Sequence, residues 1–172
     1  MRPHSRQILS VEESFGRNGW HCELVEGRDV LRAGFEAHHT RVDLLAQAHP
    51  QLNALVVVAE SPLSLDLTHR AAVLELLARA NKALTLGGFE YDLDRSMLVF
   101  RITNLFEREV YDGDIVASMV HCAIAELDRM TPYAAVVRGT PVDLLADLDL
   151  QRLLSRDDLI PPLPEESEEE EY

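Results

Sequence analysis

The spacing of hydrophobic and polar positions changes from a period of two to a period of three to four along this chain. Apolar and polar side chains alternate over residues 20–37, on either side of a turn signal at Gly27, and again over 40–48. Such alternation predicts strands with one buried face. Residues 54–59 are apolar on both faces and rich in valine, which favours a central strand. We therefore expect three successive antiparallel strands, although the second of them also fits a helical period.

A helical period begins at Thr68 and continues to Leu84, with Asp66 or Thr68 as the capping residue. The side chains of its expected buried stripe are Val73, Leu74, Leu77, Asn81 and Leu84. An amide on such a stripe must be hydrogen-bonded, and we expect it to tie the helix to the sheet. Gly87 and Gly88 follow, and glycine readily adopts the left-handed conformation that ends many helices. A phosphate-binding loop is not expected, because such loops precede a helix whereas this pair follows one.

The second half of the chain repeats the strand signal and then becomes helical. Residues 89–93 and 97–103 predict two strands joined by a short polar connection. A long helix is expected over 112–130, Thr131-Pro132 interrupts it, and helix is expected to resume over 133–137 before Gly139. Residues 141–154 carry a further short amphipathic pattern. The long helix has a broad apolar stripe made of Ile115, Val116, Met119, Val120, Ala123, Ile124 and Leu127.

These elements give the order α-β-β-β-α-β-β-α when a weak helix in the N-terminal segment 1–19 is counted. We predict an α+β fold in which a five-stranded antiparallel sheet carries its helices on one face. Residues 20–154 are expected to form a single domain, as the chain length suggests. Residues 155–172 are rich in proline and glutamate and cannot bury enough apolar surface to offset the entropy of ordering, so we expect a disordered tail.

The central part of the chain resembles the YbjN domain family of bacteria. The resemblance rests on the run from Arg70 to Asp92, on Phe100-Arg101 and on the long helix that precedes Gly139, and it covers about residues 20–140. Members of that family are described as sensory-transduction regulators with a type III secretion chaperone-like fold. The resemblance implies an α/β sandwich that often dimerises and a role in binding or regulation, with no catalytic residues to carry over. Its landmarks, for which we expect structural roles, are Asn81, Gly87, Gly88, Phe89, Phe100, Arg101 and Gly139.

Charge narrows the range of partners. The chain has 16 Lys and Arg against 30 Asp and Glu, a net charge of −14. Residues 155–172 hold eight acids and one base, or −7, which leaves −7 for residues 1–154. Nucleic acid is not an expected partner, because phosphate binding relies on Lys and Arg.

The sequence shows neither a membrane-spanning segment nor a signal peptide. No stretch of about 18 consecutive apolar residues occurs, which excludes a membrane span, and the N-terminal residues lack the apolar run of a signal peptide. A cytoplasmic location is the simplest expectation. Cys22 and Cys122 are too few for a disulfide framework and are expected to be buried apolar residues.

Two groups of side chains are candidates for a functional surface. His38 and His39 can supply imidazole to a metal ion, with Glu36 as a nearby carboxylate. Glu90, Asp92 and Asp94 alternate along one strand and can attract a cation or a basic partner, although a solvated outer face is the simpler interpretation. No recognised metal-ligand spacing and no nucleophile motif is present, so we assign no catalytic residue, no metal ligand and no cofactor.

The sequence thus predicts a non-enzymatic protein-binding module, a chaperone-like or regulatory adaptor. We expect a homodimer formed through the long helix or the sheet, because the stripe of the long helix is broader than a small core needs. Its partner is an unidentified protein or peptide. The alternative is a metal-dependent enzyme or sensor centred on His38 and His39.

Overall fold

The computed structural model describes residues 3–159 of the chain. Within this range it contains six strands, four α-helices and three short 3-10 helices. In chain order they are α1 (Arg6–Arg17), β1 (Cys22–Leu24), β2 (Val30–Glu36), β3 (Arg41–His49), η1 (Pro50–Leu52), β4 (Ala54–Pro62), α2 (Leu67–Asn81), β5 (Gly88–Asp92), β6 (Met97–Leu105), α3 (Gly113–Gly139), η2 (Val142–Asp147), α4 (Leu150–Leu154) and η3 (Asp157–Leu159).

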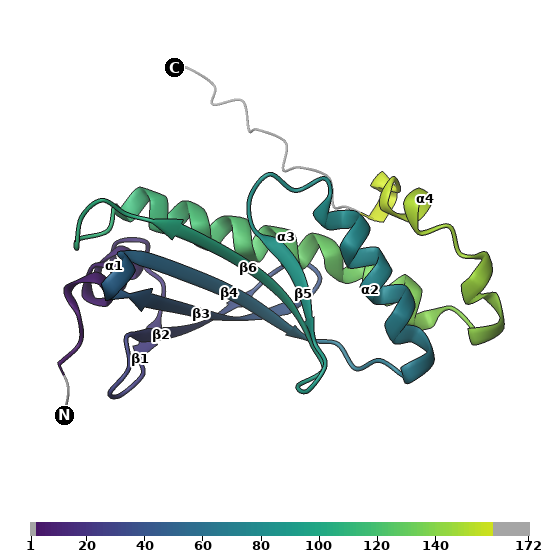
Figure 1. Ribbon diagram of the computed structural model, residues 1–172, viewed down its shortest axis with the longest axis horizontal. Helices are drawn as coiled ribbons and strands as arrows, with labels where there is room; N and C mark the ends of the chain where they lie inside the picture. The colour runs from purple at the N-terminus through teal and green to yellow at the C-terminus, as the bar shows by residue number, and fades with distance from the viewer. Residues whose placement is uncertain (1–2, 160–172) are drawn as a thin grey trace, which may run out of the picture.

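The strands form one antiparallel sheet in the order β1-β2-β3-β4-β6-β5. Helix α3 runs along the length of the sheet, with α1 at one end and α2 at the other (Figure 1). Side chains alternate between the two faces of each strand. Leu44, Ala59 and Phe100 are cross-strand neighbours on the face that packs against the helices, which we call the inner face. The opposite face is called the outer face.

One hydrophobic core lies between the inner face and the helices. The most deeply buried large side chains come from every layer of this core: Ile8, Val11, Phe15, Leu31, Leu44, Leu55, Leu76, Leu98, Phe100, Leu127, Met130 and Tyr133. Helix α1 begins where the Ser5 hydroxyl accepts a hydrogen bond from the Ile8 amide, and α3 begins where the Asp112 carboxylate accepts from Asp114 and Ile115. The predicted α+β class, with an antiparallel sheet and helices, is confirmed.

The sheet has six strands, so the predicted number of five was wrong. Residues 22–24 form a separate strand, because the chain turns at Gly27, whose φ is +70°, and returns so that Cys22 pairs with Ala33. The element order is therefore α-β-β-β-β-α-β-β-α, with α4 after it. The helical alternative for residues 42–48 was wrong as well, since β3 pairs with β2 on one side and with β4 on the other.

Helix α3 continues through Pro132, where an interruption was predicted. Proline removes one backbone hydrogen bond and crowds the preceding turn. Tertiary packing offsets this cost, because Met130, Tyr133 and Val137 on both sides of Pro132 are fully buried in the core. In α2, Leu74 is exposed instead of buried, and Leu76 and Ala80 complete the buried side of the helix.

Both ends of the predicted domain carry further structure. Helix α1, expected as a weak helix, places Ile8, Val11 and Phe15 in the core with no exposed surface. After Leu154 the chain forms η3, and the Tyr133 hydroxyl donates to the Arg156 carbonyl over 3.1 Å. Most of the predicted tail, residues 160–172, lies outside the described residues, and its disorder stays a prediction.

Candidate protein-interaction surfaces

The acid partner of His39 is Asp128, which lies on α3. The Asp128 carboxylate accepts hydrogen bonds from the backbone amides of His39 (2.6 Å) and Thr40 (3.2 Å), and its second oxygen lies 3.2 Å from His39 Nδ1. Asp128 is buried, and Thr40 extends the network through a 2.7 Å hydroxyl contact with Ser61. The turn between β2 and β3 is thereby held against the middle of α3, which is a structural role.

Glu36 does not join this group. Its exposed carboxylate faces Arg41 at 3.7 Å, while the ring of His38 meets that of His39 edge-on at 4.5 Å. Within residues 3–159, no group of three or more His, Cys, Asp or Glu side chains could hold a metal ion. The geometry therefore does not assemble the metal site considered from sequence. Asp128 was missed because it is 89 residues away from His39, and no local pattern connects them.

The acidic row on β5 is occupied by contacts within the chain. The Glu90 carboxylate accepts two hydrogen bonds from Arg101, at 2.9 and 3.2 Å. One oxygen of Asp92 accepts from the backbone amides of Asp94 and Arg95 in the β5–β6 turn. Phe89 and Tyr91 lie on the inner face, as the alternation predicts. Glu90 and Asp92 thus stabilise β5 and its turn. Asp94 was wrongly placed on the strand, because β5 ends at Asp92 and Asp94 lies in the turn that follows.

Three landmarks of the resemblance, Asn81, Phe89 and Phe100, connect α2, β5 and β6. The Asn81 side chain donates to the Phe89 carbonyl over 3.0 Å and accepts from the Phe89 amide over 2.7 Å, which ties helix to sheet as expected, although Asn81 itself is exposed. Phe89 packs on Phe100 with ring centroids 5.1 Å apart. Gly87 is left-handed, but it precedes β5 and does not end α2, which stops at Asn81. Gly88 begins β5 and Gly139 ends α3.

The outer face of the sheet carries an apolar patch at its centre. We call Leu45, Val56, Val58 and Val99 the outer-face patch; Leu45 pairs with Val58 across strands. The buried side chains of the helices join the core on the inner face, whereas Val58 and Val99 are buried outside that core. Among residues 3–159, the buried apolar side chains of the helices belong to that core and not to the outer-face patch.

Ion pairs surround the outer-face patch. Arg95 donates two hydrogen bonds to Glu60, at 2.7 and 2.8 Å, and the Glu60 side chain is only 8% exposed although it lies on this face. The Arg101–Glu90 pair lies on the same face. An apolar centre within a polar rim is the usual composition of a protein–protein interface.

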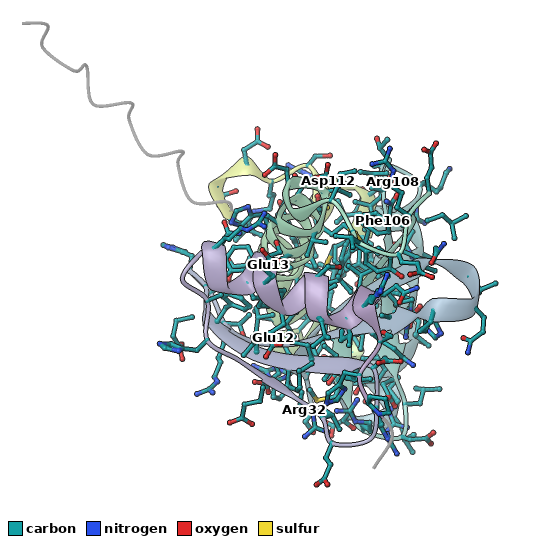
Figure 2. The ribbon with its side chains drawn as sticks, turned by 90° about the vertical axis from the view of Figure 1, so that its left-hand side faces the viewer. Glu12, Glu13, Arg32, Phe106, Arg108 and Asp112 are labelled. Carbon is teal, nitrogen blue, oxygen red and sulfur yellow. The ribbon has the colours of Figure 1, made fainter. Side chains whose placement is uncertain are left out.

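A second candidate surface is a cavity of about 310 Å³ at the opposite side of the molecule from β1, between the end of β6 and the first half of α3. We call it the edge groove; it is lined by Leu86, Gly87, Ile102, Thr103, Asn104, Asp114, Ile115, Ser118, Met119 and Cys122. It adjoins a wider hollow of about 630 Å³ along the β6–α3 connection, with which it shares Ile115. Figure 2 shows Phe106, Arg108 and Asp112 of this connection on one side of α1, with Arg32 on the other.

Comparisons with known proteins identify the fold. No protein-family model and no curated protein match the chain. A solved structure, that of YbjN from E. coli, described as a putative transcription regulator, is similar over 81% of this chain and 92% of that protein, with a TM-score of 0.50 and 12% sequence identity. The chain therefore has a YbjN-like fold, as its residues predict. Within the described residues, no helix is long and apolar enough to cross a membrane.

Proposed function

We propose that this chain is a protein-binding module without catalytic activity of its own, a regulatory or chaperone-like adaptor that works in the cytoplasm as a homodimer. The observation that carries the proposal is the outer-face patch. Val58 and Val99, at its centre, are 9% and 4% exposed and lie outside the core that the helices share, and Leu45 and Val56 beside them are half-buried. An apolar centre surrounded by a polar rim is the composition of an interaction site.

The outer face also has the charge distribution that a two-fold interface requires. Such an interface pairs one patch with the same patch of a second copy, so each charge must meet an opposite charge from the same surface. Arg41 and Asp43 lie on the outer side of β3, and Arg101 and Glu90 on that of β6 and β5. Both signs are thus present around the patch, and a second copy can bind face to face.

The long helix gives less support to dimerisation than its sequence suggested. Five of the seven stripe residues are buried within the chain, against the sheet and the other helices, while Ile124 is half-buried and Ile115 is exposed: the buried five are Val116, Met119, Val120, Ala123 and Leu127. The breadth of the stripe is explained by packing on three sides of α3. We therefore place the proposed dimer interface on the sheet and not on α3.

The likeness to YbjN, described as a regulator, agrees with a regulatory role and shows only the fold. Support for the absence of catalysis is of another kind. Three of the six titratable groups that the sequence singled out, His39, Glu90 and Asp92, are engaged in contacts that hold secondary structure together.

Sedimentation equilibrium on the full chain tests the proposal. We expect the wild type to be a dimer and Val56→Glu, which places a carboxylate on the half-buried rim of the patch, to be a monomer with an unchanged circular dichroism spectrum. Leu74→Glu, a matched change at an exposed leucine of α2, should remain dimeric. A monomeric wild type at every workable concentration would reject the homodimer.

A further inference from the structure

The edge of β6 is only partly covered. On one side, β4 pairs with β6 along its whole length, from Met97 to Leu105. On the other side, β5 pairs only with Met97 to Arg101. Among the described residues, no strand pairs with this second edge over residues 102–105. The Phe106 amide donates to the Asn53 carbonyl on the β4 side of the strand. Backbone groups of alternate residues point to opposite sides, so the amides of Thr103 and Leu105 point toward the open edge.

The reason that β5 begins only opposite Arg101 lies at Gly87, the residue before its first residue Gly88. The φ of Gly87 is +70°, so the chain turns away from β6 at this residue. A Cβ atom at Gly87 would lie 2.6 Å from the Phe100 ring and 2.7 Å from the Arg101 carbonyl oxygen, so the backbone itself is packed closely against β6. The line along which β5 would have begun earlier, beside residues 102–105 of β6, is therefore left to another segment.

The edge groove lies directly beside this open edge. Ile102 and Met119 form its buried wall, while Leu86 and Ile115 at its rim are 62% and 43% exposed. Exposed leucine and isoleucine next to an apolar cavity are typical of a binding groove. Strand β5 shows how a strand packs at this edge, because its inward-facing Phe89 contacts Phe100 of β6.

We propose that the edge groove binds an extended segment of a partner protein by strand addition to residues 102–105 of β6. Backbone hydrogen bonds to Thr103 and Leu105 align the segment, and its alternate apolar side chains enter the cavity beside Met119. The inference rests on the proposed protein-binding function and names the class of partner.

Charge specifies the partner further. Among the described residues that line the groove, one is charged, and it is Asp114. The Asp114 carboxylate forms no ion pair with another residue of the range 3–159. No lysine or arginine is part of the lining. The bound segment therefore carries a Lys or Arg next to its apolar positions, where it meets the Asp114 carboxylate.

The opposite edge of the sheet is a poorer site of the same kind. The hollow beside β1 and β2, of about 470 Å³, is lined by charges of both signs, including Glu23, Arg32, Arg41 and Asp43. These side chains discourage an apolar strand, as charged residues commonly do at sheet edges. The open backbone edge and the apolar cavity therefore coincide on β6.

A selection from a random library of short displayed peptides tests the inference on the full chain. We expect enriched peptides in which apolar residues alternate and a Lys or Arg is present. Enrichment should be lost on Ser118→Trp, which fills the groove from an exposed position, and kept on Ala125→Trp, a matched change two turns further along the same face of α3 and outside the groove.

Soluble copies of the enriched peptides supply the second readout. In a Cys22→Ser background, peptide binding should abolish maleimide labelling of Cys122, which lines the groove, and should protect the Thr103 amide from hydrogen exchange. The same peptide with alternate amides N-methylated should do neither, since it cannot pair with a strand. Asp114→Asn should weaken binding by about two- to fivefold, the size of an exposed ion pair.

Three results would overturn the inference: peptides that bind Ser118→Trp equally well, peptides without alternating apolar residues, or a library from which nothing is enriched. Protection of Cys122 by a second copy of the chain at high concentration would mean that β6 edges pair with each other instead. If the groove binds no peptide but Val56→Glu still separates a dimer, the groove inference fails and the proposed function stands.

Discussion

Glycine at position 87 is required by both conformation and space. A left-handed φ costs a residue with a Cβ about 1–2 kcal/mol, and the Cβ at this position would also collide with Phe100 and Arg101. Gly27 has the same φ of +70° but no heavy atom within 4 Å of the Cβ position. Substitution of Gly27 therefore measures the cost of the left-handed conformation alone, whereas substitution of Gly87 adds the cost of steric crowding.

We predict that Gly27→Ala lowers the free energy of unfolding by about 1 kcal/mol, whereas Gly87→Ala lowers it by a further 1–3 kcal/mol, roughly the cost of overpacking. Urea unfolding of the two variants measures the difference. Equal losses would mean that β6 moves away from Gly87 without cost.

The Glu60–Arg95 pair places a carboxylate under the guanidinium that covers it. The Glu60 side chain is 8% exposed and that of Arg95 is 54% exposed, and their hydrogen bonds raise the pKa of Arg95 above its ordinary value. We predict that Arg95→Ala destabilises the fold by about 1–3 kcal/mol, because it leaves a buried acceptor unpaired. The double variant Glu60→Met/Arg95→Ala should recover most of that loss. A double variant as unstable as Arg95→Ala would contradict this interpretation.

Tyr111 makes stability depend on pH in the alkaline range. Its ring stacks on Phe106 at 4.1 Å, its hydroxyl donates to the Ala54 carbonyl, and burial, followed by the charge of Asp29, raises its pKa to about 12. The unfolded chain ionises Tyr near its ordinary pKa of about 10 and so loses a proton that the folded chain keeps.

The contribution of Tyr111 is therefore complete below about pH 10 and is lost as the pH rises toward 12. We predict that the free energy of unfolding falls over this interval and falls less steeply in Tyr111→Phe. Tyr133, whose pKa burial also raises, remains in both proteins and serves as the common background. Parallel pH profiles for the two proteins would show that Tyr111 is not responsible.

At the scale of elements, Asp128 decides how the β2–β3 hairpin is attached to α3. It accepts from two backbone amides at the turn and faces His39. We predict that Asp128→Ala destabilises the fold by about 1–3 kcal/mol and speeds hydrogen exchange at His39 and Thr40. Asp128→Asn keeps one acceptor oxygen, so its stability should lie between that of the wild type and that of Asp128→Ala. Exchange that is unchanged at these amides in Asp128→Ala would show that β3 alone holds the turn.

Elements with a clear period could be predicted from the sequence, and those that depend on distant contacts could not. Strand β3 follows its alternation, β4 follows its run of apolar residues, and Asn81 ties α2 to the sheet as its place in the chain suggested. Strand β1 has only three residues, too few for a pattern to separate it from β2. Helix α3 passes Pro132 because the core holds both sides, which no local signal records.

The candidate surfaces were likewise predictable only where they depend on local sequence. The alternation of β4 and β6 indicates which side chains face outward, but the outer-face patch becomes visible only once the helices are seen to share the inner face. The edge groove depends on the late start of β5, whose first residue Gly88 is opposite Arg101, and this is a matter of strand length and register. His38 and His39 drew attention as a local pair, whereas their partner is set by the tertiary fold.

At the scale of the whole molecule, we propose that two surfaces of one sheet bind different partners. The outer-face patch suits a second copy of the chain, while the edge groove suits an extended segment of another protein. The net charge of −14 disfavours nucleic acid and favours a partner with basic residues. An adaptor of this design can dimerise and still keep both edge grooves open.

Affinity capture from a lysate of the native host measures protein binding through these surfaces directly. The baits are the full-length wild type, Ser118→Trp and Ala125→Trp, each verified as folded by circular dichroism. We predict that the wild type and Ala125→Trp retain a protein in stoichiometric amount and that Ser118→Trp does not. Retention of no protein in stoichiometric amount, or of the same proteins by all three baits, would contradict binding through the edge groove.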